Sequence, residues 1–89
     1  MERTEVTKKV VEILGEKLMV DDSVSAEDLE NFRFKEDLGG DSLDMIELVM
    51  DIEKEYGIHI SDAESDKLCE ENTTIRDIVD MAMGKVADK

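Results

Sequence analysis

The chain lacks most of the side chains from which proteins build rigid or reactive sites. Its 89 residues include no tryptophan, no proline, one cysteine and one histidine, and its aromatic side chains are one tyrosine and two phenylalanines. The single Cys69 excludes an internal disulfide, so packing must hold the fold. With so few aromatic residues the core must be aliphatic, filled by valine, isoleucine, leucine and some of the six methionines. A chain of this length forms one domain, 1–89, with a small core.

Positive charge is also scarce. Eleven Lys and Arg residues stand against 25 Asp and Glu residues, which gives a formal net charge of −14 and a pI near 4.2. So acidic a surface repels phosphate groups, which argues against nucleic acid or an anionic membrane as a partner and favours basic patches on other proteins. No apolar run approaches the length of a membrane span, and the N-terminus does not resemble a signal peptide. We therefore expect a monomeric, cytoplasmic protein.

Hydrophobic periodicity predicts an all-α domain, a four-helix bundle with three main helices and one short one. The main helices are expected at 4–18, 42–56 and 75–84, and the short third helix at 61–69. A long loop, 19–40, joins the first two main helices, which we expect to be roughly parallel. Its apolar residues predict that it is pinned across the core, with one helical turn after Ser25. We attribute Gly15 in the first helix to close packing, and we expect 85–89 to fray.

The segment 38–57 carries the clearest functional signal. Gly39 and Gly40 predict a tight turn, and Asp41 offers an N-cap to the helix that follows. Ser42 then lies at the first position of that helix, where its hydroxyl is exposed and faces the positive end of the helix dipole. An attached phosphodiester would be favoured there. We therefore interpret Ser42 as the attachment point of a prosthetic group.

At about 100° per residue, the apolar residues of the predicted helix 42–56 fall into two groups. The first is a core face made of Met45, Leu48, Val49, Ile52 and Tyr56. The second lies on another side of the helix and consists of Leu43, Ile46 and Met50, here called the exposed strip. Because the exposed strip lies beside Ser42 and is rimmed by acids, we interpret it as a contact for partner proteins rather than as isolated surface apolar residues.

The run Leu38-Gly39-Gly40-Asp41-Ser42-Leu43-Asp44 and the helix after it resemble the acyl carrier proteins (ACPs), and the match continues through 46–50, 52–57 and Ile60. The resemblance covers almost the whole chain. It implies that Ser42 carries 4′-phosphopantetheine, added from coenzyme A by a phosphopantetheinyl transferase, and that acyl groups ride on the terminal thiol as thioesters. Many members of the family have alanine where Gly40 stands and proline where Ser61 stands, so the chain departs from the common pattern there.

The resemblance also implies partners, namely enzymes of the acyl-ACP synthase, ketosynthase and acyltransferase types that dock through basic patches in fatty-acid, polyketide or other lipid biosynthesis. Attraction between the acidic surface and basic partners raises the association rate more than the affinity, which suits a carrier that must dissociate from each enzyme. The expected partner-binding residues are Asp41, Leu43, Asp44, Ile46, Glu47, Met50, Asp51 and Glu53. The expected core and acyl pocket comprises Met45, Leu48, Val49, Ile52, Ile60, Leu68, Ile75, Ile78 and Val79.

Other interpretations of Ser42 stand beside this one. Serine is a favoured N-cap, so Ser42 alone could be a structural residue. The run Gly40-Asp41-Ser42-Leu43 also spells the serine motif of the GDSL hydrolases. A hydrolytic serine needs a base in hydrogen-bond reach, and the helix places His59, the single histidine, about 20 Å away. We therefore expect that the chain is not an enzyme.

Two further classes differ in cargo or cofactor. A peptidyl carrier would be loaded with amino acids, and an acidic interaction module would bind a basic partner without any prosthetic group. The acidic helix and the Asp-Ser-Leu-Asp run favour the acyl type. We expect no dedicated metal site, because the acidic segment 62–66 lacks the following glycine and the later glutamate of an EF-hand loop.

Overall fold

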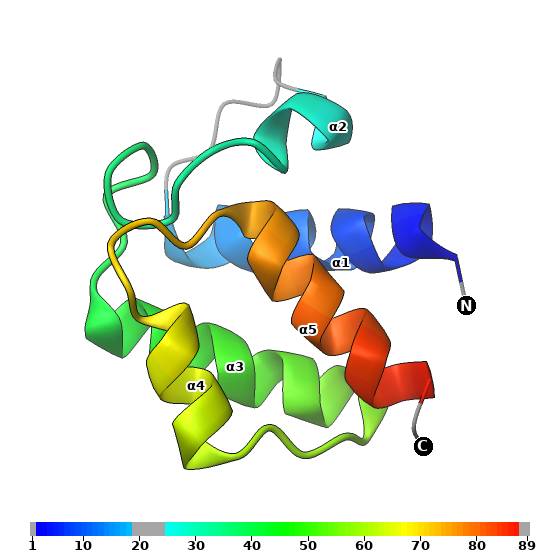
Figure 1. The fold of residues 1–89 in the computed structure, drawn as a ribbon. Coiled ribbons are helices and arrows are strands. Elements are labelled where there is room, and N and C mark those ends of the chain that lie inside the picture. The colour runs from blue at the N-terminus through cyan, green and yellow to red at the C-terminus, as the bar shows by residue number, and fades with distance from the viewer. Residues whose placement is uncertain (1, 19–24, 88–89) are drawn as a thin grey trace.

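The computed structural model of the chain describes residues 2–18 and 25–87, and Figure 1 shows them as a bundle of helices. The helices are α1 (Arg3–Lys17), α2 (Ala26–Leu29), α3 (Ser42–Tyr56), α4 (Asp62–Leu68) and α5 (Ile75–Ala87). The all-α prediction is confirmed, and α2 is the helical turn predicted after Ser25. Helix α5 continues to Ala87, so the predicted fraying of 85–87 is wrong; residues 88–89 lie outside the described part. None of the described helices is long and apolar enough to cross a lipid bilayer.

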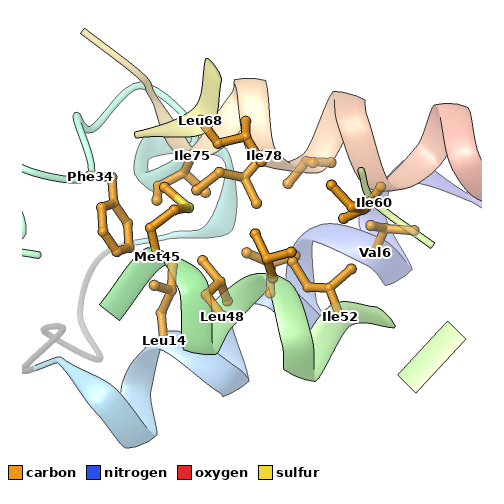
Figure 2. Close-up of a cluster of buried hydrophobic side chains, with 14 of the residues drawn as sticks. Val6, Leu14, Phe34, Met45, Leu48, Ile52, Ile60, Leu68, Ile75 and Ile78 are labelled. Atoms are coloured by element: carbon orange, nitrogen blue, oxygen red, sulfur yellow. The ribbon is translucent and has the colours of Figure 1, made fainter. Parts of the chain in front are cut away.

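Helices α1 and α3 run in opposite directions, which corrects the expectation that they are roughly parallel (Figure 1). Figure 2 agrees: Leu14, near the end of α1, lies on the side of Met45, near the start of α3, whereas Val6, near the start of α1, lies on the side of Ile52. Lys9 of α1 also pairs with Glu55 of α3, at 3.4 Å between Nζ and Oε1. The end of α1 and the start of α3 lie at the same end of the bundle. The long connection therefore returns to the end from which it left, after packing α2 against α1.

The connection before α3 is tied to the link between α4 and α5 by backbone pairing. The Phe34 N–H donates to the Thr73 carbonyl at 2.9 Å, and the Ile75 N–H donates to the Phe32 carbonyl at 3.0 Å. Arg33 and Thr74 form an isolated antiparallel bridge between these two hydrogen bonds. The loop that leads to Ser42 is thus held by residues far along the chain.

The core is aliphatic except for Phe34, and it extends the length of the bundle (Figure 2). All nine residues expected in the interior are buried. The other fully buried hydrophobic residues are Val6, Val10, Leu14, Leu29, Phe34 and Ala82. Since Leu29 and Phe34 come from the connection, the prediction that it is pinned across the core is confirmed for residues 25–40; residues 19–24 lie outside the described part. Tyr56, expected on the core face, is only half-buried.

The surroundings of Gly15 correct the idea that it serves close packing. Gly15 is exposed, and a Cβ added there would meet nothing within 4 Å.

We predict that Gly15→Ala raises the free energy of unfolding by about 0.5–1 kcal/mol, because alanine loses less backbone entropy in a helix. Gly39→Ala is the contrasting variant, since Gly39 has a φ of +72°, and we expect it to lower stability by about 1–2 kcal/mol. Urea denaturation measures both; a loss of stability in Gly15→Ala would contradict the prediction.

Candidate functional site

The start of α3 is fixed by a reciprocal pair of hydrogen bonds. The Asp44 N–H donates to Asp41 Oδ1 at 2.9 Å, and the Asp41 N–H donates to Asp44 Oδ2 at 3.0 Å. This capping box makes Asp41 the N-cap, as predicted, and Ser42 the first helical residue. The interpretation of Ser42 as a mere N-cap is therefore wrong. The capping role of Asp44 was missed, although its spacing of three residues from Asp41 was a usable signal.

The Ser42 side chain suits a covalent attachment. It is exposed, and none of the hydrogen bonds found among the described residues uses its hydroxyl. It lies at the N-terminus of a fifteen-residue helix, where the first N–H groups have no intrahelical acceptors and the dipole favours negative charge. A phosphate group on the Ser42 oxygen would lie at this helix end. The residues present therefore fit a phosphodiester-linked group.

The exposed strip faces solvent as predicted. Leu43, Ile46 and Met50 are 63%, 45% and 60% exposed, and they are the large hydrophobic residues that the described part of the chain leaves exposed. Ile46 lies four residues after Ser42, which is about 6 Å along the helix axis. The apolar surface therefore begins beside the hydroxyl, at Leu43, and continues along the helix through Ile46 to Met50.

The acids expected to bind partners are not equivalent. Asp41 and Glu47 are exposed and Asp51 is half-buried. Glu53 is turned toward the link after α3: the Ile60 N–H donates to Glu53 Oε2 at 2.8 Å, and His59 Nδ1 lies 3.2 Å from the same oxygen. Asp41 and Asp44 are both engaged in the capping box, so these two carboxylates, like that of Glu53, have internal structural contacts. Their part in partner binding stays a prediction.

A groove of about 300 Å³ lies between α3 and α4. It is lined by Ile46, Val49, Met50, Glu53, Ile60, Asp62, Ser65 and Asp66. Val49 and Ile60 were expected in the acyl pocket, whereas Ile46 and Met50 were assigned to the exposed strip. Residues of both predicted groups therefore line the same groove. The wall formed by α4 was missed, because nothing in the local sequence pattern says which helix packs beside α3.

The Glu64 carboxylate ties helix α4 both to the residue before it and to α5. Glu64 Oε1 accepts a hydrogen bond from the Ser61 N–H at 3.2 Å, and Lys85 Nζ of α5 lies 2.7 Å from the same oxygen. The hydrogen bond from Lys85, followed by those from Ser61, lowers the pKa of Glu64 from 4.5 to about 2. One wall of the groove is thus attached to α5 through a charged contact.

The chain's histidine lies far from Ser42. His59 follows the last residue of α3, whereas Ser42 is its first, and the His59 side chain is 86% exposed beside Glu53. Among the described residues there is no group of three or more His, Cys, Asp or Glu side chains that could hold a metal ion. The arrangement brings together an exposed hydroxyl, an apolar strip and acids, while the histidine lies beyond the far end of α3.

Comparison with known proteins gives the following similarities. Residues 8–82 match the family described as a phosphopantetheine attachment site. The chain is 43% identical over 77 residues to an acyl carrier protein of Thermotoga maritima, which covers 86% of each chain. It is 38% identical over 87 residues to an acyl carrier protein of Thermosynechococcus vestitus, with 98% of this chain and 99% of that protein covered. A crystal structure of an acyl carrier protein from Thermotoga maritima matches with a TM-score of 0.77 at 37% identity, over 99% of this chain and 94% of the other.

The contact of Glu64 with Lys85 predicts a pH-dependent stability. Because the folded-state pKa of Glu64 is lowered to about 2, the contact stabilises the fold above the ordinary pKa of 4.5 and is lost as the pH falls toward about 2. We expect Glu64→Gln to be less stable than the wild type at neutral pH, and the difference to disappear over that window. Thermal unfolding of both proteins across this pH range measures it.

Asp66→Asn is the matched control, since it removes an exposed carboxylate from the same helix. We expect it to show no such window. A stability difference between Glu64→Gln and the wild type that stays constant down to low pH would contradict the ion pair as its source.

Proposed function

Because the chain belongs to the acyl carrier protein family and contains its phosphopantetheine attachment domain, we propose that Ser42 is the residue that carries the 4′-phosphopantetheine arm. One observation supports this most directly. The capping box between Asp41 and Asp44 supplies the helix cap, so the Ser42 hydroxyl is exposed without a capping function. A serine in this position is open to an incoming enzyme and has no structural task to lose on modification.

Attachment would use the chain's residues in a simple way. The Ser42 oxygen forms a new bond to the phosphorus next to the pantetheine of coenzyme A, the diphosphate bond breaks, adenosine bisphosphate leaves, and the hydroxyl proton passes to a base of the transferase. The N-terminus of α3 then stabilises the phosphodiester charge. When bound, the arm supplies a terminal thiol on which acyl groups are held as thioesters.

The partners we propose are a phosphopantetheinyl transferase and enzymes of the acyl-ACP synthase, ketosynthase and acyltransferase types, met in the cytoplasm by a monomer. The net charge of −14 steers basic patches toward the carrier. The exposed strip then offers a small apolar contact at which Met50 adapts to different partners. Binding of this kind is fast and brief, as a carrier requires.

We propose that the groove between α3 and α4 shelters the acyl chain. It begins near the exposed strip and reaches the buried residues Val49 and Ile60. An aliphatic chain entering there would be removed from water, which favours its burial by about 0.8 kcal/mol per methylene. Whether the cargo belongs to fatty-acid, polyketide or other lipid synthesis is decided by the enzymes that load it.

We propose no catalytic role for the chain itself. A GDSL-type hydrolysis needs a base oriented at the serine, and His59 lies beyond the opposite end of α3. The support for this view is geometric. Esterase activity abolished by His59→Ala would contradict it.

Intact mass spectrometry tests the attachment residue. After incubation with coenzyme A and a broad-specificity phosphopantetheinyl transferase, we expect the wild type to gain one phosphopantetheine mass and Ser42→Ala to gain none. The Ser42→Ala variant should fold normally, because the Ser42 side chain is exposed and does not cap the helix. A folded wild type without the mass increment would instead make the chain an acidic interaction module.

Substitution in the exposed strip tests partner binding. Met50 is 60% exposed, so Met50→Asp should keep the fold while placing a charge in the apolar contact. We expect it to slow acyl transfer to a partner ketosynthase or acyltransferase by about tenfold, a loss in the range of a disrupted docking contact. Thr4→Asp adds the same charge on an exposed position of α1 and is the control. Equal transfer rates for both variants and the wild type would remove the exposed strip from the docking surface.

A further inference from the structure

The groove between α3 and α4 has two walls of different chemistry. Three of the four lining residues that come from α3 are hydrophobic, namely Ile46, Val49 and Met50. The lining residues that come from α4 are all polar, namely Asp62, Ser65 and Asp66. A saturated acyl chain in this groove finds hydrophobic partners on the α3 side, but it removes water from the polar groups of α4 without replacing their hydrogen bonds. The groove is therefore incompletely matched to a plain hydrocarbon chain.

Ser65 is the most enclosed residue of the polar wall. It is half-buried, whereas Asp62 and Asp66 are exposed and keep their contact with water. The hydrogen bonds at the start of α4 use Ser61 and Glu64, and none of those found among the described residues uses the Ser65 hydroxyl. A serine hydroxyl can both donate and accept a hydrogen bond. The Ser65 hydroxyl is thus available to a polar group that enters the groove.

We propose that Ser65 is a specificity-determining residue of the groove, which gives hydroxylated acyl chains an advantage over saturated chains of the same length. A hydroxyl on the chain pairs with the Ser65 hydroxyl, and the carboxylates of Asp62 and Asp66 offer further acceptors for its proton. A keto group has no proton to donate to these carboxylates, and a carboxylate on the chain is repelled by them. The α4 wall thus selects a hydroxyl among the polar groups that a chain can carry. This inference rests on the proposed sheltering of the acyl chain in the groove.

The test compares the stability of the protein with different cargo. A broad-specificity transferase loads it from octanoyl-, 3-hydroxyoctanoyl- or 8-hydroxyoctanoyl-coenzyme A, which place the hydroxyl at opposite ends of the chain, and intact mass verifies each product. A group that binds only the folded state stabilises it, so urea denaturation reports how well each chain occupies the groove. We expect octanoyl to raise the folding equilibrium constant above that of the unacylated form. At least one hydroxylated chain should raise it by a further three- to tenfold, about the effect of one hydrogen bond.

Substitution of Ser65 tests the residue itself. Ser65→Ala should fold, because alanine favours a helix and the side chain is only half-buried. We expect it to keep the gain from octanoyl and to lose the additional gain from the hydroxylated chain. Ser65→Thr is the matched control, since it keeps a hydroxyl at this position, and it should retain the additional gain. Each gain is measured against the unacylated form of the same variant, which removes the effect of the substitution on the fold.

The outcomes separate this inference from the proposed function. A wild type that gains no mass would refute attachment at Ser42, and the absence of any gain in stability from octanoyl would refute sheltering in the groove. A gain from octanoyl with no further gain from either hydroxylated chain would overturn only the role of Ser65, and so would an additional gain that survives in Ser65→Ala. Should Ser65→Ala fail to fold, amide resonances of the wild type decide: the octanoyl and hydroxyoctanoyl forms must differ at Ser65, and identical resonances there would overturn the proposal.

Discussion

The exchange of hydrogen bonds between Asp41 and Asp44 fixes the residue at which α3 begins, and the functional surface takes its register from that residue. In a helix of 3.6 residues per turn, the starting point decides which side chains face the core and which face solvent. Starting at Ser42 turns Met45, Leu48 and Val49 inward and leaves the exposed strip outside. The same capping box removes the need for a serine cap. One pair of carboxylates thereby determines both the availability of the hydroxyl and its surroundings.

Three of the positive charges of this acidic chain lie where helices meet. Lys9 joins α1 to α3 through Glu55, and Lys85 joins α5 to α4. Arg3 reaches from α1 to Glu30, just after α2, and also contacts Asp80 of α5. Exposed ion pairs contribute little one by one, yet in a molecule with a net charge of −14 each of them neutralises an acid at a helix contact. The contacts between the helices are thereby relieved of repulsion.

The features that could be predicted from the sequence are those set by neighbours along the chain. Asp41 at one end and Gly57 at the other, which caps α3 with a φ of 63°, gave the correct bounds of this helix. Apolar periodicity separated the buried face of α3 from the exposed strip. Both follow from local geometry, which a single sequence carries in full.

The features that could not be predicted depend on residues distant in sequence. The opposite directions of α1 and α3, the pairing of Phe34 with Thr73 and the wall that α4 gives to the groove all come from packing between elements. Glu53 looked like a surface acid because its partner, the Ile60 N–H, lies beyond the helix stop. The local sequence pattern does not show which distant residues will contact each other.

The hydrogen bond from the Phe34 N–H to the Thr73 carbonyl has a consequence for the order in which the protein is made and used. A contact of such long sequence separation forms late, because the intervening chain must first close into a loop. On a ribosome, the residue that accepts this hydrogen bond is synthesised long after Ser42. A nascent chain that stops short of Thr73 therefore lacks part of the backbone support for the loop that leads to Ser42, the proposed attachment residue. This hydrogen bond can form only after the chain has been synthesised as far as Thr73.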